Sequence, residues 1–340
     1  MTISAPSRSI EADVQHRLDK KTKPTGSLGR IEQLALQLAL ALDTPEPKLD
    51  SPQMVVFAAD HGIAAHGVSA YPSDVTWQMV ENFLSGGAAV AVLARQHGLA
   101  LTVVDCGVRH DFAPRPGLIV AKVATGSGDT LERPAMTAAQ CSQAMANGAG
   151  VVASLPGNAI LLGEMGIGNT SAAALLMARL TGLPVEECAG RGTGLDDAAF
   201  AHKLEVLRSA LQRAPDATSP EAALADVGGL EIATMVGCIL EATRLRRVIV
   251  VDGFICTAAV AVAIAIEPKV FAQCVFAHCS AESGHARWLD RLGASVLLRL
   301  DLRLGEGSGG ALAWPLLESA CRILAEMASF ESAGVYNRAD

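Results

Sequence analysis

Aromatic and charged residues are scarce in this 340-residue chain, and their scarcity limits what the chain can be. Aromatic residues account for 4% and charged residues for 18%, whereas hydrophobic residues account for 50%. This apolar content is enough for a large buried core, and the 32 glycines suit helices packed closely over a sheet. The formal net charge of −8 and the pI near 5.5 argue against a nucleic-acid or anionic-membrane partner.

The chain also lacks the marks of export, membrane insertion and disulfide bonding. Residues 1–21 contain no apolar segment of a secretory signal, and the longest nearly apolar stretch, 254–266, is too short to span a bilayer. None of the eight cysteines forms a Cys-x-x-Cys pair, and several lie in apolar runs, which indicates buried thiols in a reducing compartment. We therefore expect a soluble cytoplasmic protein with no membrane partner.

Short apolar runs alternate with longer helical stretches, which predicts an α/β fold. Most of the runs are continuous Val, Ile, Leu and Ala, as in strands of a parallel sheet buried on both faces. The order of elements predicts a Rossmann-like, doubly wound parallel sheet flanked by helices, with right-handed crossovers. The strands are expected at 54–59, 101–106, 159–163, 248–252, 275–278 and 295–302. The helices are expected at 74–96, 138–153, 171–181, 198–212, 229–243 and 257–266.

The two ends of the chain differ from its middle. Residues 10–42 predict two helices separated by KTKPTGSLGR, and residues 311–329 predict a closing helix. Because no strand is expected outside 54–302, helices from both ends should pack together as a small lobe. The Pro- and Asp-rich segment 43–52 marks the boundary of that lobe.

This division gives three expected segments and one long surface loop. They are 1–50 (N-terminal helices of the lobe), 51–305 (sheet domain), 306–340 (C-terminal helical segment joining the lobe) and 111–134 (the loop).

One glycine-rich loop, GEMGIGNTS at 163–171, follows a predicted strand and precedes a helix. Gly166 and Gly168 permit close backbone approach, and Asn169, Thr170 and Ser171 are residue types that cap helices. Free N–H groups and the positive end of the helix would attract a phosphate. The loop matches neither the Walker sequence nor a full G-x-G-x-x-G, so it does not imply a nucleoside triphosphate. An ordinary capped helix is the alternative.

Further polar residues follow other predicted strands. Lys203 lies on the helix after GRGTGLDD and could reach a neighbouring phosphate as a point charge, or it could lie in solvent. Asp252 ends a strand and could contact a sugar hydroxyl or a partner loop. The segment HCSAESGH at 278–285 ends another strand and could make the same contacts, but for His278 and His285 we favour a structural role.

The first predicted strand is followed by DHGIAAHGVSAYP at 60–72. His61 and His66 are five residues apart without a third ligand at a recognisable spacing, so no metal site is expected. The segment also lacks the G-x-G-x-x-G fingerprint that a Rossmann-type NAD(P)-dependent oxidoreductase would carry there. That oxidoreductase is the main alternative function.

A single acidic side chain, Glu306, lies within the glycine-rich segment LGEGSGGA at 304–311. The segment follows an apolar run and precedes a helix, which places Glu306 at the sheet edge where ligands bind in open parallel sheets. The flanking glycines would let a substrate approach, and Glu306 could then act as a general base. Alternatively it is only a charge favoured at a helix start. A non-catalytic nucleotide-binding regulator would not need this carboxylate.

These motifs together resemble the nicotinate-nucleotide:dimethylbenzimidazole phosphoribosyltransferase family. The resemblance covers nearly the whole chain in family order, with small departures at His66 and Ser283. The matching segments are KPTGSLGR (23–30), FAADHGIAAHGVSAYP (57–72), NFLSGGAAVAVLAR (82–95), GEMGIGNTSAAA (163–174), GRGTGLDD (190–197), GGLEIATMVG (228–237), VVDGF (250–254), HCSAESGH (278–285) and RLGEGSGGALA (303–313).

The resemblance implies that nicotinate mononucleotide and 5,6-dimethylbenzimidazole react to give α-ribazole 5′-phosphate and nicotinate, a step of cobalamin nucleotide-loop assembly. It implies a Rossmann-like sheet domain with a small helical lobe, a homodimer, and no metal or cofactor. It also implies roles for individual residues. The general base is Glu306; the phosphate and ribose are bound by Glu164, Gly166, Gly168, Asn169, Thr170, Ser171, Lys203 and Asp252; and the benzimidazole pocket contains Ser69, Tyr71, Gln78 and Leu304.

Overall fold

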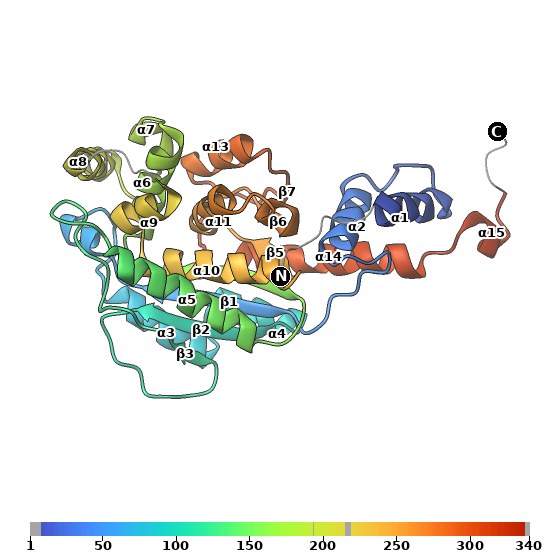
Figure 1. Ribbon diagram of the computed structural model, residues 1–340, viewed down its shortest axis with the longest axis horizontal. Helices are drawn as coiled ribbons and strands as arrows, with labels where there is room; N and C mark the ends of the chain where they lie inside the picture. Colours follow the sequence, from blue (N-terminus) through green and yellow to red (C-terminus); the bar gives the residue numbers. More distant parts are fainter. Residues whose placement is uncertain (1–7, 193, 215–218, 337–340) are drawn as a thin grey trace.

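A computed structural model describes residues 8–192, 194–214 and 219–336 of the chain. These residues contain one seven-stranded, wholly parallel sheet with the strand order β3-β2-β1-β4-β5-β6-β7 (Figure 1). The strands are β1 (Gln53–Ala59), β2 (Ala100–Gly107), β3 (Leu118–Val120), β4 (Ala159–Met165), β5 (Val248–Val251), β6 (Cys274–His278) and β7 (Val296–Leu298). The predicted Rossmann-like parallel sheet is confirmed.

The strand order reverses between β1 and β4, and this reversal fixes where a ligand can enter. In open parallel sheets the crevice lies outside the carboxyl ends of the strands at such a switch point. The two strands pair from Gln53 opposite Ile160 to Ala58 opposite Met165. Their carboxyl ends, which carry the loops after Ala59 and Met165, therefore lie side by side.

Helices cover both faces of the sheet, and β1 contributes alternate side chains to a hydrophobic core on each face. Val55 and Phe57 belong to one core, whereas Met54 and Val56 belong to the other. The helices are α1 (Arg8–Lys20), α2 (Arg30–Ala41), the 3-10 turn η1 (Gly62–His66), α3 (Val75–Ser85), α4 (Ala89–His97), α5 (Ala138–Ser154), α6 (Asn169–Thr181), α7 (Val185–Cys188), α8 (Asp197–Arg213), α9 (Pro220–Val227), α10 (Leu230–Arg244), α11 (Phe254–Ile266), α12 (Val270–Gln273), α13 (Ser283–Leu292), α14 (Ser308–Glu326) and α15 (Phe330–Ala333).

Helices from the two chain ends pack against one another at one side of the sheet (Figure 1). α1 and α2 contact each other and α14. Lys21 forms a bridge with Ser329 and donates a hydrogen bond from Nζ to the carbonyl oxygen of Met327 (2.6 Å). α14 also packs against β4, β6 and α4, so this helix connects the terminal helices to the sheet. Among the described residues, no helix is both long and apolar enough to cross a lipid bilayer.

Three expectations about the elements were wrong. The single helix expected at 74–96 is two, because Gly86 adopts a left-handed conformation (φ 81°) that ends α3. The expected buried strand at 295–302 is only the three-residue β7, which is half-buried because it lies at the edge of the sheet. The loop expected at 111–134 contains the short edge strand β3.

Candidate active site

A cleft opens at the carboxyl edge of the sheet, where five chain segments meet. They are the end of β4 with the loop into α6, the loop between α7 and α8, the start of α11, the end of β6 with the residues after it, and the loop before α14. The lining residues are Glu164, Met165, Gly166, Ile167, Asn169, Thr170, Gly192, Gly253, Phe254, Ile255, His278, Ser280, Glu282, Arg303, Leu304, Gly305 and Glu306. The cleft therefore brings together Glu306, Leu304 and half of the residues expected at the phosphate.

The loop that carries Glu306 has an unusual backbone. Gly305, Glu306 and Gly307 are consecutive residues with positive φ (78°, 64° and 90°). A side chain on Gly305 would collide with Glu164 Oε1, and one on Gly307 would lie 2.6 Å from Met54 Sδ. Both positions therefore require glycine. The left-handed conformation of the non-glycine residue Glu306 costs about 1 kcal/mol, which the surrounding contacts must offset.

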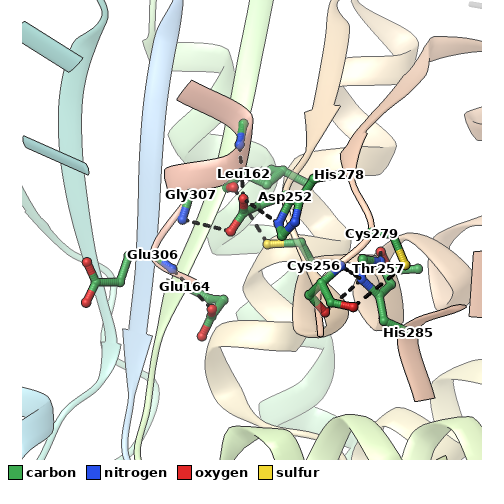
Figure 2. Close-up of polar contacts among 12 residues, drawn as sticks. Leu162, Glu164, Asp252, Cys256, Thr257, His278, Cys279, His285, Glu306 and Gly307 are labelled. Atoms are coloured by element: carbon green, nitrogen blue, oxygen red, sulfur yellow. Dashed lines mark hydrogen bonds and ion pairs between the residues drawn. The ribbon is translucent and has the colours of Figure 1, made fainter. Parts of the chain in front are cut away.

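Two carboxylates hold this loop in place from behind. Asp252 accepts hydrogen bonds from the N–H groups of Gly307 and Gly310 (both 3.0 Å), and Glu164 Oε1 accepts one from the N–H of Glu306 (3.3 Å). Figure 2 shows Glu164 and Asp252 beside the loop backbone, while the side chain of Glu306 extends away from both. Asp252 is 1% exposed and also lies 3.3 Å from His278 Nε2. These contacts show that Asp252 positions the loop that carries Glu306. From the sequence, we expected Asp252 only as a ligand of the ribose.

The clustering of buried acids shifts their proton affinities. Burial, with a further contribution from Asp252, raises the pKa of Glu306 to about 7. Burial and the charge of Asp252 likewise raise the pKa of Glu164 to about 8. A carboxyl group with a pKa near 7 can accept and release a proton at neutral pH, as general base catalysis requires.

The GEMGIGNTS loop begins α6 at the other side of the cleft, but much of its glycine content serves packing. A side chain on Gly166 would lie 2.4 Å from the carbonyl oxygen of Ala59, and one on Gly168 (φ 101°) would lie 3.2 Å from His61 Cβ. Three of the backbone N–H groups are already used: Ile167 donates to Thr76 Oγ1 (3.1 Å), while Asn169 and Ser171 donate to the carbonyls of Gly166 and Gly168 (both 3.0 Å). The loop is therefore less open to an anion than its sequence indicates.

Side chains of the same loop make the remaining contacts. Asn169 donates from Nδ2 to Glu164 Oε2, which orients that carboxyl group. Ser171 is fully buried. Thr170 lines the cleft and connects it to Lys203, whose Nζ donates to Thr170 Oγ1 and to the carbonyl of Gly190 (both 3.1 Å).

Lys203 is fully buried, so the alternative of a solvated lysine was wrong. Burial lowers its pKa to about 8, although the nearby charge of Glu282 acts in the opposite direction. The backbone at Gly192 is close enough that a side chain there would lie 3.8 Å from the Lys203 ammonium and 3.4 Å from Thr170 Oγ1. Thr170 and Gly192 thus line the cleft and also lie beside the Lys203 ammonium group. Thr193, part of the same motif, lies outside the described residues.

Three residues expected at the benzimidazole do not line the cleft. Ser69 and Tyr71 follow the η1 turn, where Ser69 Oγ accepts a hydrogen bond from the Tyr71 N–H (3.3 Å), and Tyr71 is 51% exposed. Gln78 is exposed on α3. Leu304 does line the cleft, although half of its surface remains exposed.

The histidines have distinct environments. His285 accepts the N–H of Ser280 at Nδ1 (2.9 Å), so its ring proton lies on Nε2, next to Thr257 Oγ1 (2.9 Å). Burial lowers the pKa of His285 to about 3, which fits the structural role expected for it. His278 lines the cleft, a position that the expected structural role did not anticipate.

The two histidines after β1 point to different partners. His61 Nε2 lies 2.8 Å from Glu231 Oε1, whereas His66 Nε2 lies 2.6 Å from Asp129 Oδ2.

The predicted site residues left out His278, Ser280, Glu282 and Arg303, although the segment 278–285 had been named as a possible contact for a sugar hydroxyl. The motif HCSAESGH contains three of them. Its position after a predicted strand was the available signal, because all strands of a parallel sheet end at the same edge.

Comparison with known proteins gives a consistent assignment. A family model described as "Phosphoribosyltransferase" matches residues 3–335. A nicotinate-nucleotide–dimethylbenzimidazole phosphoribosyltransferase of Variovorax paradoxus is 65% identical over 96% of this chain and 94% of its own length. One of the same name from Dechloromonas aromatica is 54% identical over 99% of this chain and 98% of its own.

Solved structures agree with these matches. The crystal structure of CobT from Thermus thermophilus has a TM-score of 0.93 and 40% identity, and the match covers 97% of this chain and all of that one. These similarities give no support to the oxidoreductase alternative. With the matched model spanning almost its full length, the chain belongs to the phosphoribosyltransferase family.

Proposed function

We propose that this protein transfers the phosphoribosyl group of nicotinate mononucleotide to 5,6-dimethylbenzimidazole, giving α-ribazole 5′-phosphate and nicotinate. The observation that carries the proposal is Glu306, a buried carboxyl group with a pKa near 7 that lines the cleft of a phosphoribosyltransferase. The names of the relatives supply the two substrates. The product is a building block of the cobalamin nucleotide loop.

The chemistry explains why one carboxylate is enough. A ring nitrogen of dimethylbenzimidazole attacks the anomeric carbon as the bond to nicotinate breaks, and nicotinate leaves with the bonding electrons. Its ring nitrogen becomes neutral, so no general acid is needed. The second nitrogen of the benzimidazole becomes acidic when the first is glycosylated, and Glu306 removes its proton. Attack opposite the leaving group inverts the configuration from β to α, while the carboxylate stabilises positive charge on the ribose.

The phosphate is proposed to lie between the start of α6 and Lys203. Thr170 and the backbone of Gly192 flank the ammonium group, which would supply the cation. Of the remaining residues expected here, Glu164 lines the cleft and Asn169 orients it. Gly166, Gly168 and Ser171 shape the loop. We propose that Asp252 contributes indirectly, by holding the Glu306 loop.

The benzimidazole is proposed to lie against Leu304, beside Glu306. This apolar side chain is exposed at the rim of the cleft, where it can cover the face of a ring. Ser69, Tyr71 and Gln78 would have to complete the pocket from the segment between β1 and α3. The hydrogen bond from Ile167 to Thr76 ties the first turn of α3 to the cleft loop, which supports that arrangement.

We also propose the larger organisation that the sequence predicts. Residues 1–50 and 306–340 would form a lobe separate from the sheet domain at 51–305, within a homodimer. Residues 1–7 and 337–340 of that lobe lie outside the described structure. A cytoplasmic location is supported by the eight cysteines, all of which are free thiols.

The decisive experiment incubates the purified protein with nicotinate mononucleotide and dimethylbenzimidazole and follows the products by mass spectrometry. We expect α-ribazole 5′-phosphate and nicotinate in equal amounts. Replacing Leu304 by Asp should raise the KM for dimethylbenzimidazole far more than the KM for nicotinate mononucleotide, because it places a charge against the apolar ring. Failure to form the product would overturn the proposed function, and equal increases of both KM values would overturn the assignment of Leu304.

A further inference from the structure

A second cavity, of about 520 Å³, lies at the edge of the sheet opposite to the Glu306 cleft, where the strands begin. It is bordered by α2, by α12 and by the residues that begin β6 and precede β7. Because the strands are parallel, their amino ends and the cleft at their carboxyl ends face opposite edges. A molecule in this cavity would therefore not touch the proposed substrates.

The walls of the cavity are apolar and its rim is basic. Leu36 and Leu40 of α2 and Phe276 of β6 contribute apolar side chains to its lining, and Arg30 and Lys269 contribute positive charges. A third cation, Arg246, pairs with Asp43 (3.2 Å). None of the described residues that line the cavity is an aspartate or glutamate. The surroundings are thus complementary to a molecule that combines an apolar body with a negative charge.

Two of the residues that line the cavity carry a polar atom that has no hydrogen-bond partner and is covered by protein atoms. Gln273 is 6% exposed, and its Oε1 is buried and unpaired. The guanidinium group of Arg30 contacts Gln33 Oε1 (3.2 Å) and the carbonyl of Ser295 (3.3 Å), but its Nε is buried without a partner. Removing such a group from water and leaving it unpaired costs free energy. A bound molecule with one acceptor and one donor would recover that cost by displacing the side chains that cover the two atoms.

We propose that this cavity binds a small aromatic carboxylate that also carries a hydrogen-bond donor. The ring packs against the leucines of α2 and Phe276. The side chains that cover Arg30 Nε and Gln273 Oε1 shift, so that the first atom donates to the carboxylate and the second accepts from the donor of the bound molecule. The volume suits a molecule of one or two fused rings. Lys269 adds a second positive charge at the entrance.

The test titrates the full-length protein with 6-hydroxy-2-naphthoate and with its uncharged isostere, 6-hydroxy-2-naphthamide, by calorimetry. We expect the acid to bind at least about 10-fold more tightly than the amide, because a hydrogen bond to a charged group contributes more to binding than one between neutral groups. Arg30→Gln should abolish that preference. Similar Kd values for the two compounds with the unaltered protein would overturn the proposal.

Three variants locate the bound probe. Ala272→Phe fills the cavity from an exposed position of α12 and should weaken binding of the acid at least 10-fold. The matched control Ala153→Phe, exposed at the end of α5, and the cleft variant Leu304→Asp should leave it unchanged. Binding that survives Ala272→Phe, or that is lost with Leu304→Asp, places the probe elsewhere and refutes the site. Sedimentation velocity completes the test: a lower mass for Ala272→Phe would show that a second copy of the chain covers the cavity, which also refutes it.

Discussion

Two clusters of buried charge illustrate opposite uses of the protein interior. Among the terminal helices, Lys23 Nζ lies 2.9 Å from Glu32 Oε1, and both side chains are at most 9% exposed. At the cleft, Glu164, Asp252 and Glu306 are buried together, although all three are acids. The first cluster pairs opposite charges, whereas the second concentrates like charges and raises the pKa of two of its members.

The difference teaches which cluster serves stability and which serves chemistry. Burying a carboxylate costs free energy unless a cation or several donors compensate for it. Lys23 supplies that compensation to Glu32, while the N–H groups of the Glu306 loop supply only part of it at the cleft. Proton affinities tuned by such uncompensated burial are typical of functional sites. We therefore expect substitutions in the two clusters to have opposite consequences.

The largest effect should come from Glu306→Gln. The amide keeps the shape of the side chain but cannot accept a proton, so turnover should fall about 10²-fold or more, as is usual for loss of a general base. Dimethylbenzimidazole binding should change little, and thermal stability at neutral pH should rise, because the raised pKa of Glu306 makes its ionised form unfavourable in the folded state. The measurement is kcat under saturating substrates together with calorimetric binding, and a variant with nearly unaltered kcat would remove Glu306 from the mechanism.

The next largest effect tests the terminal cluster. Lys23→Met leaves Glu32 buried without its cation and should lower the free energy of unfolding by about 3 kcal/mol at pH 7. Catalysis by the remaining folded protein should be unaffected. Urea denaturation measures the loss, and the double variant Lys23→Met with Glu32→Leu is the control, because it removes both charges and should recover most of the stability. A single variant as stable as the parent would contradict the comparison.

Removing an acid from the cleft should stabilise the protein. A carboxyl whose pKa is raised by folding contributes stability that is complete below its unfolded pKa of about 4.5 and is lost as the pH rises through the folded value, here about 8 for Glu164. Glu164→Gln stays neutral and should be more stable than the parent by about 3 kcal/mol or more at pH 8.5 and by less than about 1 kcal/mol at pH 5. The Asn169 amide can rotate to accept from the new amide. The measurement is the free energy of unfolding of both proteins at the two pH values. If the variant and the parent were equally stable at pH 8.5, burial of Glu164 would not raise its pKa as proposed.

The smallest effect concerns the pH profile. The value of kcat/KM should fall below about pH 7 because Glu306 becomes protonated there. Asp252→Asn removes a neighbouring negative charge and should move this limb down by about half a pH unit or more. Activity measured between pH 5 and pH 9 tests both statements. A limb that stays in place in the variant would show that burial alone sets the proton affinity of Glu306.

Strands with a strong local sequence pattern could be predicted from the sequence. β1 and β4 are continuous apolar runs, and both were predicted within two residues of their observed ends. β3 was not predicted, because a three-residue strand is stabilised by its pairing with β2 and not by its own sequence. Pairing of this kind depends on residues that are distant in the chain.

The same limit applies to the cleft. Glu306 could be identified from its glycine-flanked position, because that pattern has a local cause in the backbone. The contacts of Asp252 could not be identified from the sequence. Its partner Gly307 lies 55 residues away and donates from the main chain, so no pattern of side chains reveals the hydrogen bond. The glycines at 166 and 168 suggested an open anion site, yet they accommodate neighbouring residues of the protein itself.

The joining of both chain ends has a consequence for synthesis on the ribosome. Leu34 and Leu38 of α2 belong to the same hydrophobic core as Trp314 and Leu317 of α14, and Lys21 bonds to Met327 across 306 positions. At a translation rate of 5–20 residues per second, the first helices wait about 15–60 s for the partner that covers them. During that interval their apolar faces are available to chaperones or to other nascent chains. The N-terminal helices can therefore complete their packing only after α14 has been synthesised.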